Sequence, residues 1–219
     1  MRQPGVCLPL AAILAVLTGG CETLKLKPTE VAVAAPPQNY FAPAKTGEQF
    51  RRVALLPMHS GNLPDQYVRA LDAAFLSELS KRGLFEIVPV SRTQMESLFG
   101  ERQFASTDPL PADALKQLQE RYGVDGILFT DLTHFSPYRP VSMGVRTKLV
   151  AANTGQIRWA FDYVFDAGNA TVAGAAKRFQ MTYSNEQQPL TSDGGSILLS
   201  PTRFAKYVAN ETYASLLHE

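Results

Sequence analysis

The order of apolar and polar positions predicts alternating strands and helices from residue 51 onward. Two short apolar runs, 51–58 and 84–90, are bounded by turn residues, which is typical of buried strands. Between them, apolar residues recur every three or four positions over 65–82, and this spacing predicts an amphipathic helix that ends at Gly83. Because a helix joins the two strands, they should lie parallel with a right-handed crossover.

Further helices are expected downstream. Ser91 is a favourable N-cap for a helix that continues to about Gly100, and a polar loop then leads to a helix over 111–123. A helix from about Asn169 to Tyr183 follows later in the chain. A terminal helix opens at Ser200-Pro201, because serine caps a helix and proline suits its first turn.

The clearest local signal is a β-hairpin within 141–166, which follows a third strand predicted over 124–135. Apolar and polar residues alternate on both sides of Asn153-Thr154-Gly155, and a period of two is typical of strands with one buried face. The second run places five apolar residues on one face: Ile157, Trp159, Phe161, Tyr163 and Phe165. A binding platform or a lipid-facing strand would also use such a stripe, but we interpret it as core, because the domain needs one strongly apolar sheet face.

The turn predicts the register of the hairpin. A three-residue connection would hold Gly155 in the left-handed region. Lys148 would then lie opposite Asp162, and Leu149 opposite Phe161. We prefer this register because it pairs opposite charges on one face and apolar residues on the other.

The elements read β-α-β-α-α-β-β-β-α-α, which defines the α/β class. We expect a mixed sheet of about five strands with flanking helices, as a two-layer or a three-layer sandwich. Residues 49–219 should form one domain. Residues 21–48 are interrupted by proline and are expected to be an extended, Pro-rich tether.

The first 20 residues, 1–20, have the three parts of a secretory signal peptide. Arg2 supplies a positive charge, an apolar run covers about Val6 to Leu17, and the small residues Gly19 and Gly20 close the segment. The run is shorter than the ~18–20 apolar residues that span a bilayer as a helix. A buried helix and a retained anchor are the weaker alternatives.

Cys21 directly follows the two glycines, and this arrangement resembles the lipobox of bacterial lipoproteins. The resemblance implies cleavage before Cys21, lipidation of its thiol and attachment to the membrane through acyl chains such as palmitate. Leu17 lies one place further from Cys21 than the family prefers. Glu22 stands where Asp marks inner-membrane retention in enteric lipoproteins, so the resemblance implies the periplasmic face of the outer membrane.

Charge and cysteine content exclude several functions. Cys7 lies in the segment that would be removed, so Cys21 would be the one cysteine left and no disulfide or cysteine metal site is expected. Cleavage removes one of the 21 basic side chains and none of the 20 acidic ones. A balanced surface argues against a nucleic-acid partner, which requires clustered Lys and Arg.

The sequence offers no candidate for catalytic chemistry. The three histidines lack metal-ligand spacing, and no nucleophile or phosphate-binding motif occurs, so we expect no catalytic residue, cofactor or metal. Asp131 and His134 are three positions apart and should point to opposite faces of a strand, with Asp131 exposed. Asp162 shares a face with Lys148 and Arg158, which is typical of a solvated, charge-paired surface.

Four stretches in this order carry a resemblance to one group of bacterial lipoproteins: RVALLPM, LSKRGLFEIVPVSRTQMESLFGER, YGVDGILFTDLTHF and KLVAANTGQIRWAFDYVFD. Over about residues 50–180 the chain is similar to the periplasmic α/β domain shared by CsgG, LpoB and TolB-amino-terminal-like lipoproteins. The resemblance implies an outer-membrane protein that binds, assembles or activates other envelope proteins without catalysis.

We therefore expect a lipid-anchored periplasmic accessory factor for cell-envelope assembly, secretion or activation that acts through protein–protein contacts. Its partner is unidentified, and homo-oligomerisation stays open. One alternative is a subunit of a CsgG-like outer-membrane secretion channel, which would need extra lipid-facing strands of ~9–11 residues that the sequence does not offer. The alternative from another class is a periplasmic hydrolase, which would need converging polar side chains.

Overall fold

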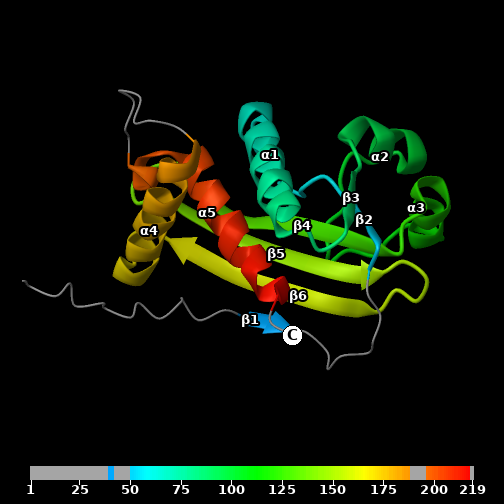
Figure 1. Ribbon diagram of the computed structural model, residues 1–219. Coiled ribbons are helices and arrows are strands. Elements are labelled where there is room, and N and C mark those ends of the chain that lie inside the picture. Colours follow the sequence, from blue (N-terminus) through cyan, green and yellow to red (C-terminus); the bar gives the residue numbers. More distant parts are fainter. Residues whose placement is uncertain (1–38, 42–49, 188–195, 218–219) are drawn as a thin grey trace, which may run out of the picture. The chain divides into compact units, whose positions relative to one another are not determined.

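The structure, a computed structural model, describes residues 39–41, 50–187 and 196–217 (Figure 1). The strands are β1 (Asn39–Phe41), β2 (Arg52–Leu55), β3 (Glu86–Pro89), β4 (Gly126–Ser136), β5 (Ser142–Ala151) and β6 (Ile157–Asp166). The helices are α1 (Asp65–Arg82), α2 (Arg92–Phe99), α3 (Ala114–Tyr122), α4 (Ala170–Gln187) and α5 (Pro201–Ala214), with short 3-10 helices at Ile197–Leu199 and Ser215–Leu217. From residue 50 onward this is the predicted order of strands and α-helices.

The strands form one mixed sheet in the order β1-β6-β5-β4-β2-β3. β2 lies parallel to both β3 and β4, and the other neighbouring strands are antiparallel. The expected α/β class, with a mixed sheet and flanking helices, is confirmed. β1 is a three-residue addition that pairs with β6 and comes from the segment expected to be the tether, 21–48.

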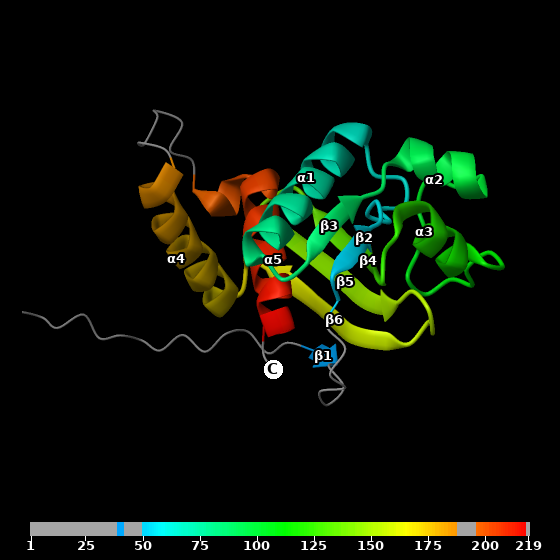
Figure 2. The ribbon, with the colours of Figure 1, turned by 45° about the vertical axis from the view of Figure 1, so that its right-hand side comes forward.

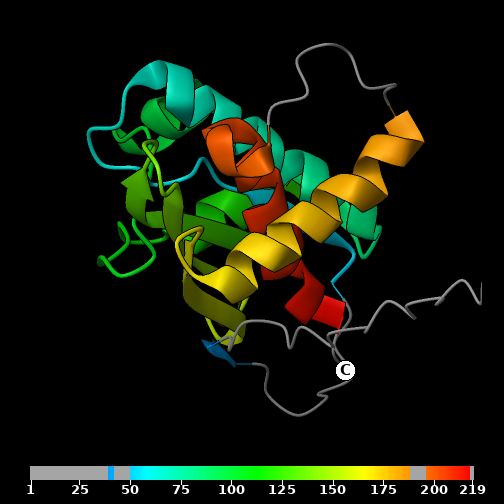
Figure 3. The ribbon, with the colours of Figure 1, turned by 90° about the vertical axis from the view of Figure 1, so that its left-hand side faces the viewer.

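Helices cover the two faces of the sheet unequally. α1, α4 and α5 lie over one face, and Figure 3 shows α4 crossing in front of α5. The core beneath them includes Leu55, Phe75, Leu128, Val145 and Tyr207. α2 and α3 gather at the end of the sheet that β2 and β3 form, away from α4 (Figure 2). They cover a second core on the opposite face, which includes Leu56, Met95, Leu118, Ile127 and Phe129. The sandwich therefore has three layers at that end and two elsewhere.

The apolar stripe of β6 belongs to the first core, as predicted. Trp159, Phe161 and Phe165 are buried. The ring centroids of Phe165 and Tyr207 of α5 lie 5.8 Å apart in an edge-to-face arrangement, which is a favourable geometry for aromatic pairs. The indole nitrogen of Trp159 donates to the hydroxyl of Ser215 over 3.2 Å, so this buried donor has a partner.

The predicted register of the hairpin is wrong by two residues. Two pairings change: Arg146–Asp162 replaces Lys148–Asp162, and Leu149–Trp159 replaces Leu149–Phe161. Arg146 Nε donates to Asp162 Oδ2 over 2.7 Å, so the expected charge pairing is made by a different cation. Because the shift is even, the side chains keep their predicted faces.

The centre of the turn accounts for this shift. A pairing of Lys148 with Asp162 needs a turn centred on Gly155, whereas the observed pairing of Arg146 with Asp162 centres the turn on Thr154. The N–H of Ala151 donates to the carbonyl of Gln156 over 2.9 Å, and the connection spans 152–156 instead of three residues. Gly155 adopts a φ of 69° within it, which is the left-handed conformation that was expected. Ile157, the first residue of the predicted stripe, is 41% exposed next to this turn.

Hydrogen bonds between polar groups join the end of α1 to α5. Arg82 donates through Nη2 to the backbone carbonyl and the side-chain oxygen of Asn210. Beside it, burial raises the pKa of the Glu211 carboxyl, although Asn210, Arg82 and Arg178 act in the opposite direction. The protonated form of Glu211 is therefore favoured more strongly in the folded chain than in the unfolded chain.

We expect Phe165→Ala to lower the free energy of unfolding by about 3–5 kcal/mol, because it removes a fully buried aromatic side chain. Val164 is next to Phe165 but 49% exposed, and Val164→Ala should lower the free energy by less than about 1 kcal/mol. Urea unfolding of both variants measures the difference. Equal losses would contradict the assignment of the two faces of β6.

The raised pKa of Glu211 predicts a pH dependence of stability. Since the folded chain binds this proton more tightly, the wild type loses stability as pH rises from about 4.5 through the raised pKa. Glu211→Gln removes that loss and keeps an oxygen that can accept from Asn210. In urea unfolding, the stability of the variant relative to the wild type should therefore increase between pH 4 and pH 7. A difference that does not change with pH would refute the assignment.

Candidate functional site

A cleft of about 580 Å³ opens at the carboxyl ends of β2 and β3, between α1 and α2. At this end of parallel strands, loops and helix starts converge, and ligands are often bound there in α/β proteins. The lining is mostly apolar and includes Leu55, Pro57, Met58, Val68, Leu76, Pro89 and Val90. The cleft is thus a concave apolar surface whose charged groups come from the surrounding helices.

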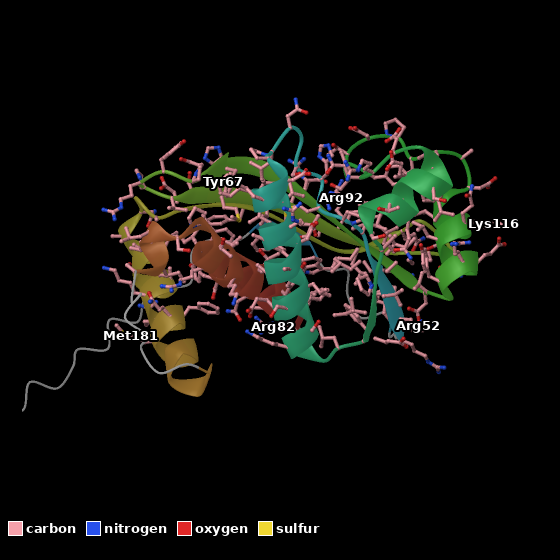
Figure 4. The ribbon with its side chains drawn as sticks, turned by 90° about the horizontal axis from the view of Figure 1, so that it is seen from above. Arg52, Tyr67, Arg82, Arg92, Lys116 and Met181 are labelled. Atoms are coloured by element: carbon pink, nitrogen blue, oxygen red, sulfur yellow. The ribbon has the colours of Figure 1, made fainter. Side chains whose placement is uncertain are left out.

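An arginine–aspartate pair joins the two walls of this cleft. Arg92, the first residue of α2, binds the carboxylate of Asp72 in α1 through Nη1 and donates through Nη2 to the carbonyl of Met58 over 2.7 Å. Asp72 Oδ1 accepts the N–H of Met58 over 3.0 Å. Burial raises the pKa of Asp72, while Arg92 and the Met58 N–H lower it. The pair ties α1, α2 and the segment after β2 together, and Figure 4 shows Arg92 between the two helices.

Two further arginines line the cleft with exposed side chains. Arg69 extends from α1 and makes no hydrogen bond or ion pair with any residue that the structure describes. Arg102 follows α2, and its Nε lies 3.9 Å from Glu96 Oε2. Both side chains of that pair are more than half exposed, and such a pair contributes little. Arg69 and Arg102 therefore keep most of their capacity to bind an anion.

The lining of the cleft includes neither Asp131 nor His134, the two residues that the sequence analysis considered as a pair. Cys21, the expected lipidation site, lies outside the described residues. Asp131 was expected to be exposed, and this is wrong: it is only 4% exposed. Its carboxylate accepts the N–H and the hydroxyl of Ser106, at 2.9 and 2.5 Å. Ser106 lies in a polar loop 25 positions earlier, so no local pattern reveals this contact.

The prediction that Asp131 and His134 point to opposite faces is also wrong. A bulge in β4 shifts the register between them, so Asp131 lies opposite Arg146 and His134 lies opposite Gly144. Since Arg146 and Gly144 are two residues apart in β5, all four side-chain positions share one face. The two residues nevertheless bind different partners, because His134 Nε2 is hydrogen-bonded to the hydroxyl of Ser142 over 2.7 Å.

A sequence signal for the bulge is Gly144. A Cβ at this position would lie 2.5 Å from Thr133 Oγ1, so the bulged strand leaves room for glycine alone. Glycine inside a strand pattern often marks a bulge or a close approach of another strand. The bulge brings His134 onto the face of Asp131, but the carboxylate of Asp131 is held by Ser106 and not by His134.

The described residues contain no group of three or more His, Cys, Asp or Glu side chains placed to hold a metal ion. In the same part of the chain, no helix combines the length and the apolar character needed to cross a membrane.

Comparison with known proteins gives no match to a family model and none to a curated protein. Similar solved structures include lipoprotein GNA1162 from Neisseria meningitidis, with 15% identity, a TM-score of 0.42, and coverage of 64% of this chain and 99% of that chain. A PelC dodecamer from Paraburkholderia phytofirmans has 11% identity, a TM-score of 0.41, and coverage of 63% of this chain and 87% of that chain. The LpoB C-terminal domain from Escherichia coli has 16% identity, a TM-score of 0.36, and coverage of 54% of this chain and 85% of that chain. Similarity at this level carries no conclusion about what the chain binds.

We expect Arg92→Met to lower the free energy of unfolding by about 1.5–3 kcal/mol, because it leaves the partly buried carboxylate of Asp72 without its charged donor. Arg69→Met is the matched control, since it removes an equal charge from the same cleft. It should change the free energy by less than about 0.5 kcal/mol. Urea unfolding at neutral pH compares the two variants. If both lose the same amount, the Arg92–Asp72 pair does not hold the helices together.

Proposed function

We propose that this chain is a lipid-anchored protein on the periplasmic face of the outer membrane. It acts without catalysis, as an accessory factor in envelope assembly, secretion or activation, through protein–protein contacts. The observation that carries the proposal is Cys21, placed directly after Gly19 and Gly20 at the close of an apolar run. Residues 1–20 are removed as a signal peptide, and the acylated cysteine becomes the first residue of the mature chain.

Acyl chains on Cys21 supply the membrane attachment. Two chains are enough for stable anchoring, whereas one gives only marginal binding. Residues 22–38 would reach about 50 Å if they were extended at ~3.1 Å per residue. The tether therefore allows the domain, residues 49–219, to meet partners away from the lipid surface, and β1 attaches the end of the tether to β6.

Protein contacts are the activity that the surface of the domain supports best. The cleft offers an apolar lining next to Arg69 and Arg102. The buried carboxylate of Asp131, outside the cleft, is already bound within the chain by Ser106. A surface of this kind suits recognition better than catalysis, which requires polar groups that remain available to a substrate.

Cell fractionation tests the anchor. The wild type should be found in the outer-membrane fraction of a density gradient. A Cys21→Ala variant, made with the signal peptide of a soluble periplasmic protein in place of residues 1–20, should be found in the soluble periplasmic pool. Cys7→Ala in the native leader is the control and should behave as the wild type, because Cys7 is removed with the leader. Membrane retention of the Cys21→Ala variant would rule out anchoring through acyl chains alone.

A further inference from the structure

We propose that the cleft between α1 and α2 binds a short acidic–apolar segment of a partner protein. An apolar side chain of the segment lies on the floor of the cleft, and a neighbouring carboxylate binds Arg69 and Arg102. The inference rests on the proposed function for the presence of a protein partner, and it adds where that partner is held and by what chemistry. All residues that line the cleft belong to the described part of the chain.

The floor of the cleft is suited to an apolar side chain. Its volume of about 580 Å³ lies within the ~300–1,000 Å³ that is typical of ligand sites. One face of α1 contributes Val68, Asp72 and Leu76, which recur at helical spacing. The ends of β2 and β3 contribute further apolar residues, among them Leu55 and Pro89. Asp72 does not interrupt this lining with a free charge, because Arg92 binds it.

The charges around this floor favour an anionic group. The charge of Arg92 is matched by Asp72. Asp65, the remaining acidic residue of the lining, is the first residue of α1, where the positive end of the helix dipole offsets its charge. Two exposed guanidinium groups are left, Arg69 and Arg102. Guanidinium groups bind carboxylates through paired hydrogen bonds, so a carboxylate is the complementary group.

The positions of these groups favour a peptide that carries both features. Arg69 belongs to α1 and Arg102 follows α2, so the two cations come from the two elements that form the walls of the cleft. A carboxylate alone would leave the floor uncovered, and an apolar group alone would leave the arginines unmatched. Since the Arg92–Asp72 pair joins the walls, the cleft is formed before the ligand arrives, which reduces the entropy lost on binding.

A peptide-display experiment tests the proposal and does not require the partner to be identified. The full-length protein, purified in detergent and immobilised through a carboxyl-terminal tag, is used to select from a random twelve-residue peptide library. The enriched peptides are synthesised, and their affinities are measured for the wild type and for Arg69→Glu/Arg102→Glu. Lys116→Glu/Arg121→Glu is the matched control, because it reverses two exposed charges on α3, outside the cleft. Thermal unfolding checks that both double variants are folded.

We expect enriched peptides with Asp or Glu next to a large apolar residue. Their binding should weaken at least tenfold in the cleft variant and stay within twofold in the control variant. Failure to enrich such peptides, or equal binding by the cleft variant and the wild type, would overturn the proposal. So would binding of decanoate at the cleft without any enriched peptide, which would assign the site to a small amphiphilic anion. Peptide binding is measured on purified protein. Its result therefore does not depend on the result of the fractionation experiment, which tests the anchor.

Discussion

The structure depends on covering the apolar face of β6. Trp159, Phe161 and Phe165 stand in one row on this strand and are buried beneath α5. A sheet face of this kind has to be covered by another layer, and here the cover comes from the last long helix of the chain. The first core therefore closes only when residues 201–214 return across strands formed by residues 52–166.

α1 packs against α5, the helix that covers β6, and α1 also forms one wall of the cleft. At one end of α1, Arg82 binds Asn210 of α5. Midway along α1, Asp72 binds Arg92 at the start of α2. The cleft lies where these helices separate, and its lining takes Leu55 from the first core and Leu56 from the second. The lining of the cleft therefore comes from both faces of the sheet.

The sequence pattern was sufficient for the features that depend on local periodicity. The element order, the N-cap at Ser91 and the buried stripe of β6 follow from residue spacing alone, and the structure confirms each of them. Features that depend on distant contacts could not be predicted. The burial of Asp131 follows from Ser106, and the cleft follows from the Arg92–Asp72 pair. The hairpin register was wrong for a local reason, because the turn is centred on Thr154 and not on Gly155. The bulge in β4 was not predicted either, although Gly144 is a local signal for it.

The central claim is that this domain works at the end of a lipid anchor, and intact-mass spectrometry of the protein extracted from membranes tests it most directly. If the domain is anchored in this way, the chain starts at Cys21, lacks residues 1–20 and carries the added mass of two or three acyl chains on that residue. Fragmentation would place the added mass on Cys21. An uncleaved chain, or a chain cleaved at another residue without acyl chains, would contradict the account.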